Sequence, residues 1–176
     1  AGPASEGKPQ AAAVLGPLQA LPFEEQVRTR QFIHLACFTA VHAVRLNFVL
    51  GTVAQQLAAK EGPTQSGAAR AESLSAAFSA LLPCGFLGLP VISWLLEFKR
   101  VAVSCLLVDS LGLAYGLLLA SSARPCLLAA FCLVALSQQC LYSTFFAAVA
   151  KRFGFLHYGK HVGLINLGVT FVGAAQ

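Results

Sequence analysis

Long apolar runs separated by short polar segments dominate the pattern along the chain. A helix needs about 20 residues to cross the hydrocarbon core of a bilayer, and four runs are of about that length. A fifth run is shorter and is still apolar where the sequence stops, so we expect it to be truncated. The pattern predicts about five transmembrane helices, over residues 32–53, 74–96, 101–120, 126–150 and 162–176.

Two segments precede the first run. Residues 1–21 are rich in Ala, Gly and Pro and have little periodicity, which predicts a disordered linker. Residues 22–31 are charged and are compatible with a short interfacial helix that leads into the membrane. Because the connections between the apolar runs are mostly short, successive helices must run antiparallel and pack side by side. The expected fold class is therefore an all-α membrane protein.

The composition agrees with lipid as the solvent. Of the 176 residues, 57% are hydrophobic and 11% are charged, whereas a soluble domain carries about 25% charged residues. The net charge of +5 comes from scattered residues and not from a basic stripe with interleaved aromatics, so nucleic acid is not an expected partner. The six cysteines form no C-x-x-C pair and are expected to be small buried hydrophobes rather than disulfides or metal ligands.

Enzyme signatures are missing from the sequence. It has no H-E-x-x-H, G-x-S-x-G, P-loop or G-x-G-x-x-G motif. We therefore expect no enzymatic activity and no cofactor. The partner that the composition implies is the lipid bilayer.

The basic residues between the runs predict the orientation. One side of the expected membrane holds eight of them and the other side holds three, and the richer side is expected to be cytoplasmic. The richer side has Lys8, Arg28, Arg30, Lys99, Arg100, Lys151, Arg152 and Lys160, and the poorer side has Lys60, Arg70 and Arg124. This places the N-terminal segment in the cytoplasm.

Ionisable residues inside the predicted helices are the strongest functional signal, because a charge within a bilayer is costly and rarely idle. Arg45 lies deep in the first run, and His42 precedes it by three residues and shares its helix face. The pair either lines a polar cavity and attracts a carboxylate, or it is structural, with Arg45 held by a buried acid or a carbonyl. Asp109, in the third run, is a proton or cation site, the ion partner of Arg45, or a structural group.

Further polar and small residues mark the later runs. Gln138 and Tyr142 share one face of the fourth run, and Asn166 lies in the fifth. These side chains either line a solute path or bond neighbouring helices. The pairs Gly112/Gly116, Gly159/Gly163 and Gly85/Gly88 favour close helix packing. Pro83 and Pro90 are expected to weaken the helix of the second run.

The first run resembles the seventh transmembrane helix of the large neutral amino acid transporters of solute carrier family 43. That helix has a central Leu-Arg followed by Phe-x-x-Gly-Thr, which Arg45, Phe48, Gly51 and Thr52 match, whereas 42–44 depart from the usual Gln-Leu before the Arg. The stretch 142–149, with Tyr158-Gly159 and Gly163-Leu164, is similar to the family's tenth and eleventh helices. Apicomplexan amino acid transporters carry a related pattern.

The resemblance implies the C-terminal half of a major facilitator superfamily protein, with an N-terminal helical half outside this sequence. It implies facilitative uptake or exchange of neutral amino acids by alternating access at the plasma membrane. The residues that would contact the substrate are His42, Arg45, Asn47, Gln138, Tyr142 and Asn166, with Asp109 as an ion-pair or coupling residue. The alternatives are a nucleobase or other small-solute transporter of the same fold, and a non-transporting scaffold or receptor-like membrane protein.

Overall fold

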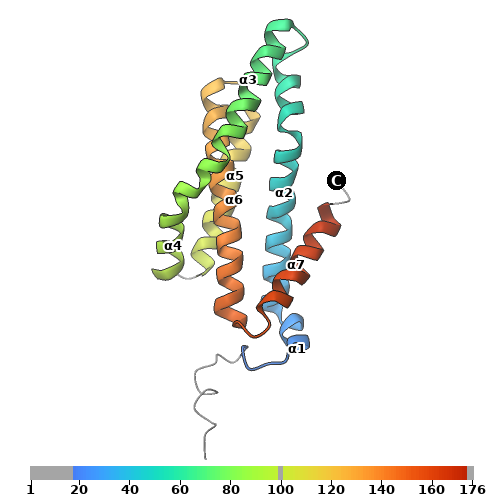
Figure 1. The fold of residues 1–176 in the computed structure, drawn as a ribbon, viewed down its shortest axis with the longest axis vertical. Coiled ribbons are helices and arrows are strands. Elements are labelled where there is room, and N and C mark those ends of the chain that lie inside the picture. The colour runs from blue at the N-terminus through green and yellow to red at the C-terminus, as the bar shows by residue number, and fades with distance from the viewer. Residues whose placement is uncertain (1–17, 99–100, 174–176) are drawn as a thin grey trace, which may run out of the picture.

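The computed structural model describes residues 18–98 and 101–173, and within them the chain is helical and has no β-strand. Figure 1 shows a bundle in which long helices run up and down and a shorter helix, α7, leans against one side. In chain order the elements are α1 (Phe23–Arg28), α2 (Arg30–Glu61), α3 (Gln65–Leu81), the 3₁₀ helix η2 (Pro83–Gly88), α4 (Leu89–Phe98), α5 (Val101–Ala120), α6 (Arg124–Phe153) and α7 (Tyr158–Gly173).

Local sequence signals set the two ends of α2. The Thr29 side chain accepts a hydrogen bond from the Phe32 backbone N–H at 3.3 Å and caps the first turn. At the other end Gly62 adopts φ 79°, a conformation that favours glycine, and the helix stops there. At about 1.5 Å per residue, its 32 residues span roughly 48 Å. This exceeds the hydrocarbon thickness of about 30 Å, so α2 is long enough to extend beyond it.

The second predicted helix is interrupted. Between Gln65 and Phe98 the chain passes from α3 into η2 and then into α4. The break begins at Pro83, which has no N–H to continue the α-helical ladder. A Cβ atom on Gly85 would lie 2.5 Å from the Ala135 carbonyl oxygen of α6. The expected weakening by proline is therefore present, and glycine allows the broken segment to approach α6 closely.

Two apolar clusters hold the bundle together. The larger lies among α2, α3, α4, α5 and α6 and includes Leu46, Phe78, Val108, Phe131 and Leu141, all of which are buried. The smaller lies near α1 and joins α2, α6 and α7 through Phe32, Phe145, Phe153 and Ile165.

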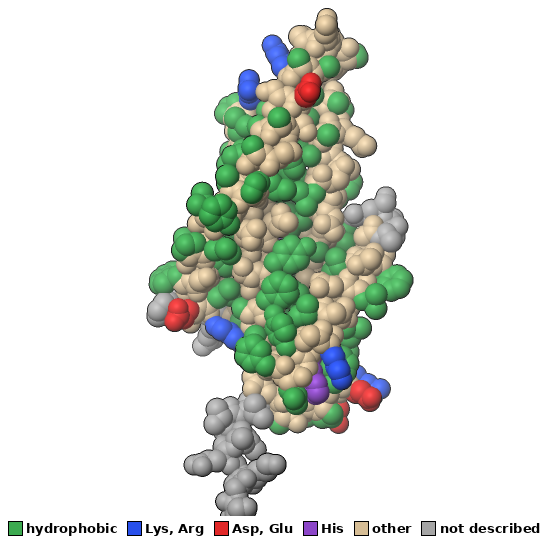
Figure 2. All heavy atoms as spheres, viewed as in Figure 1, with side chains coloured by type: hydrophobic (Ala, Val, Ile, Leu, Met, Phe, Trp, Pro, Cys, Tyr) green, Lys and Arg blue, Asp and Glu red, His purple; other side chains and the backbone are tan. Residues whose placement is uncertain are grey.

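Four helices are long and apolar enough to cross a membrane: Arg30–Glu61, Gln65–Glu97, Val101–Ala120 and Arg124–Phe153. In Figure 2 hydrophobic side chains cover the middle of the visible face, and Lys, Arg, Asp and Glu gather toward the two ends. Lysines at those ends bind helix C-termini: Lys60 donates to the carbonyl oxygens of Leu119 and Ser121, and Lys151 donates to that of Leu96. The arrangement indicates an integral membrane protein.

Several details differ from the sequence-based expectation. The helices that contain the first and fourth predicted runs extend beyond them at both ends. The fifth run forms α7, whose 16 residues are not among the four candidate spans. The predicted linker over 1–21 lies mostly outside the described residues, and 18–21 form a turn in which Gln19 donates to the Lys151 carbonyl. All six cysteines are free, although only Cys140 is buried, so the expectation of buried thiols is wrong for the other five.

Candidate functional site

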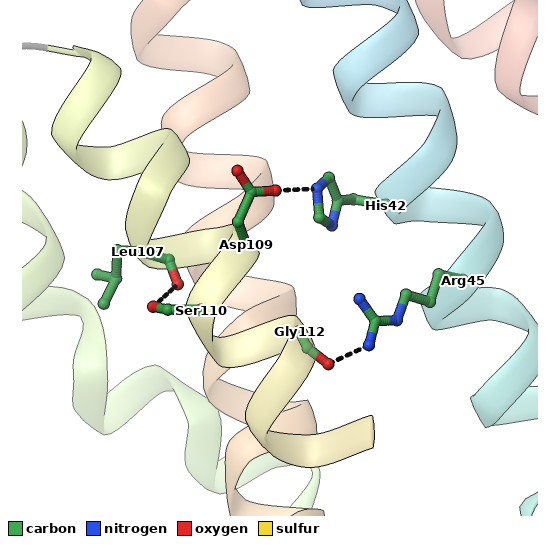
Figure 3. Close-up of polar contacts among 6 residues, drawn as sticks. All are labelled: His42, Arg45, Leu107, Asp109, Ser110 and Gly112. Atoms are coloured by element: carbon green, nitrogen blue, oxygen red, sulfur yellow. Dashed lines mark hydrogen bonds and ion pairs between the residues drawn. The ribbon is translucent and has the colours of Figure 1, made fainter. Parts of the chain in front are cut away.

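The candidate site lies where α2 and α5 run side by side in the same direction (Figure 3). Two polar contacts join the helices, one from His42 to Asp109 and one from Arg45 to Gly112. Both contacts connect residues 67 positions apart, so the two helices stay in register over a full turn. The i and i+3 spacing on each helix therefore places two polar side chains of α2 opposite one face of α5.

His42 and Asp109 form the first contact. The His42 Nε2–H donates to Asp109 Oδ1 at 2.7 Å. The His42 side chain is 10% exposed, whereas that of Asp109 is 49% exposed. The Phe38 ring packs on the imidazole from the preceding turn, with ring centroids 4.6 Å apart. One carboxylate oxygen is therefore held by a buried imidazole, and Asp109 keeps accessible surface.

Arg45 makes the second contact. Its Nη2 donates to the Gly112 carbonyl oxygen, and its guanidinium carbon lies 4.9 Å from the centre of the Tyr115 ring. A Cβ atom on Gly112 or Gly116 would come within 2.8 Å of a guanidinium nitrogen. The two glycines thus form a cradle that lets the guanidinium reach the backbone and the aromatic face of α5. Of the two interpretations of Arg45, this contact matches the structural one in which a carbonyl holds it.

The charges of Arg45 and Asp109 do not neutralise each other. In the described part of the chain, the acid–base contacts within 4.0 Å are His42–Asp109 and Arg70–Glu61, so Arg45 has no carboxylate partner there. The expectation that Asp109 is the ion partner of Arg45 is wrong, because Asp109 faces His42 one turn away. A guanidinium has five N–H donors, and the Gly112 carbonyl takes one of them. A cation and a carboxylate therefore lie one turn apart, each with unused bonding capacity.

The other candidate residues do not join this arrangement. Asn47 and Asn166 are exposed on α2 and α7, and Gln138 is half-buried on α6. Among the described residues, the side chains of these three make no hydrogen bond. Tyr142, also half-buried, stacks on Phe146 with centroids 6.4 Å apart. The polar stripe on α6 thus stays a prediction, separate from the His42–Arg45–Asp109 cluster.

Sequence reasoning missed the role of Tyr115 and interpreted Gly112 and Gly116 as a helix-packing motif. The glycines do allow a close approach, but the approaching group is the Arg45 side chain and not the backbone of another helix. Tyr115 lies between the two glycines in sequence and is 1% exposed. An aromatic residue inside a G-x-x-x-G pair, on the helix that carries the possible ion partner of Arg45, was the available signal.

The site is thus a charged cluster between two of the helices that are able to cross a membrane. Comparison with protein-family models, with curated proteins and with solved structures finds no match for this chain.

Proposed function

We propose that this chain is part of a multi-pass membrane transporter that moves a neutral α-amino acid by alternating access. The observation that supports the proposal is that Arg45, which has no carboxylate partner among the described residues, lies one helical turn from the half-exposed Asp109 between two apolar helices. A charge in the middle of a bilayer costs at least about 2.5–3.5 kcal/mol. One carbonyl and one aromatic face compensate Arg45 only in part, and this favours a guanidinium that also serves a solute.

A zwitterion is the solute class that matches two opposite charges one helical turn apart. The free N–H groups of Arg45 suit a carboxylate, which guanidinium binds in a bidentate geometry. Asp109 Oδ2 is not engaged by His42 and suits an ammonium group. A nucleobase, which carries no such pair of full charges, would leave both groups without an ionic partner. This difference favours amino acids over the nucleobase alternative.

The proposed architecture is the C-terminal half of a major facilitator protein, with the N-terminal segment cytoplasmic and the plasma membrane as location. In that superfamily two six-helix halves rock about a site near the bilayer midplane. Arg45 is the sixteenth residue of the 32-residue α2, and this mid-helix depth is compatible with such a site. The missing half would cover the exposed face of Asp109 and close the site around the solute.

Uptake of labelled leucine and labelled adenine by cells that express the full-length protein tests the proposal. We expect leucine uptake that other large neutral amino acids inhibit. Arg45→Ala and Asp109→Asn should each strongly reduce it at unchanged surface expression. Arg70→Ala, which removes an exposed arginine paired with Glu61 at 4.0 Å, is the matched control and should transport normally.

Three results would contradict the proposal in different ways. Normal leucine uptake by Arg45→Ala would show that the cluster is structural. Adenine uptake without leucine uptake would keep a transporter but reject the zwitterion. Uptake of neither compound by protein shown at the cell surface would favour another solute or a non-transporting scaffold.

A further inference from the structure

A cavity of about 470 Å³ opens between α2, α5 and α6, one to two turns from the His42–Asp109 pair on the side of α1. Its volume lies in the range of about 300–1,000 Å³ that is usual for small-molecule sites. Its lining includes Gln31, His34, Leu35 and Phe38 from α2, Cys105 and Leu106 from α5, and Arg152 from α6.

The lining is divided by polarity. Leu35, Phe38 and Leu106 are among the side chains of the apolar wall, whereas Gln31, His34 and Arg152 provide polar groups. Those three residues lie near the ends of their helices, and the apolar wall continues toward Asp109. The cavity is thus amphipathic along the helix axis, with its polar end where the bundle would meet the membrane surface.

Arg152 is the charged group of this cavity. Its Nη1 donates to Gln31 Oε1 at 3.2 Å, and this neutral amide holds the guanidinium at the mouth. Among the described residues Arg152 has no carboxylate within 4.0 Å. The other two side-chain nitrogens of Arg152, the Gln31 amide nitrogen and the His34 ring make no hydrogen bond within the described part of the chain, so they can donate to an anion.

We propose that this cavity binds a monoanionic amphiphile, specifically a single-chain alkyl carboxylate. Its carboxylate would bind Arg152, with His34 and Gln31 as further donors, and its chain would lie along Leu35, Phe38 and Leu106. One guanidinium without an acidic partner matches one carboxylate, because the two form a charge-assisted pair. The site does not depend on the transport proposal, since it lies outside the Arg45–Asp109 cluster.

Cys105 lines the cavity, so a bound ligand should slow the chemical labelling of its thiol. The experiment uses the full-length protein in nanodiscs, with Cys105 as its single cysteine, and measures the rate of maleimide labelling. The probe is decanoate, and decanol is the uncharged chain of equal length. A second protein keeps only Cys132, which is exposed on α6 and lines a different hollow beside η2, as the matched control.

We expect decanoate to slow Cys105 labelling in a saturable manner, decanol to have little effect, and Cys132 labelling to stay constant. Arg152→Gln should weaken protection by decanoate about tenfold, the loss expected for a charge-assisted hydrogen bond. Lys160→Gln removes a cation at the same end that lies over the Phe23 ring and outside the cavity, and it should leave protection unchanged. An unaltered ligand-free labelling rate would show that Arg152→Gln keeps the cavity intact.

Equal protection by decanol and decanoate would overturn the assignment of a carboxylate site. Absence of saturable protection, or full protection in Arg152→Gln, would overturn the proposal as well. Because the assay measures ligand binding and not uptake, its failure is distinct from a failure of the transport proposal.

Discussion

Replacing Gly112 by alanine should displace Arg45 while keeping its charge. The added Cβ would lie 2.8 Å from Arg45 Nη1, closer than non-bonded atoms tolerate, and 3.4 Å from Cζ. The guanidinium is the far end of a flexible side chain, so it should swing away at little steric cost and lose its bond to the Gly112 carbonyl. A hydrogen bond to a charged group contributes about 1.5–3 kcal/mol. The lower end of that range applies here, because Arg45 is only half-buried.

The higher helix propensity of alanine offsets part of this loss in stability. Alanine stabilises a helix interior by about 0.5–1 kcal/mol relative to glycine. The net result is a loss of about 0.5–1 kcal/mol in the free energy of unfolding. Gly51 provides the matched control, because it lies in α2 with no atom within 4 Å of an added Cβ. Gly51→Ala should therefore stabilise the protein by about 0.5–1 kcal/mol, so the two substitutions differ in sign.

Denaturant unfolding of the purified protein in detergent measures both values. A double-mutant cycle then isolates the contact: in an Arg45→Ala background the cradle is empty, and Gly112→Ala should become stabilising like Gly51→Ala. Stabilisation by Gly112→Ala in the presence of Arg45 would refute the reasoning, because it would mean that the cradle contributes nothing.

Two glycine substitutions test the helix packing, and one buried histidine tests the pH dependence of stability. Gly85→Ala should destabilise the protein by about 1–3 kcal/mol, because its Cβ would meet the Ala135 backbone at 2.5 Å and backbone cannot move aside. Gly88→Ala should cost less, since its Cβ would meet the end of the Leu136 side chain; equal losses in unfolding experiments would contradict this distinction. His161 is fully buried against Phe23, Phe32 and Phe153, and burial lowers its pKa from 6.5. Because the unfolded chain then takes up the proton more readily, stability should be full above pH 6.5 and fall as the pH drops toward the folded pKa. Melting temperatures at pH 7.5 and 5.5 should show a drop that is smaller in His161→Phe; an equal drop would mean that other groups cause it.

The helical fold was predictable because hydrophobic run length is a strong signal. Chain segments that must satisfy every backbone group in lipid form helices, and the apolar runs locate them. Boundaries were less predictable, since amphipathic ends such as 54–61 of α2 continue the helix without being apolar. The interruption at Pro83 was expected as a weakening, but its 3₁₀ form depends on packing against α6, which a single sequence does not encode locally.

The candidate site was predictable as a set of residues and not as a set of contacts. Arg45, His42 and Asp109 stand out because ionisable groups are costly in apolar helices. Their pairing depends on the register between α2 and α5, and a shift by one turn would have joined Arg45 to Asp109. Tyr115 was missed because a buried tyrosine in an apolar run resembles core packing until its neighbour is known.

Competition for uptake of labelled leucine tests the central claim, that Arg45 and Asp109 together bind a zwitterion, most directly. The competitors are unlabelled leucine, 4-methylpentanoate, which lacks the amine, and isoamylamine, which lacks the carboxylate. We predict strong inhibition by leucine and weak inhibition by either single-charge analogue. Inhibition by one analogue as strong as that by leucine would contradict the claim, because one of the two charged groups would then contribute nothing to recognition.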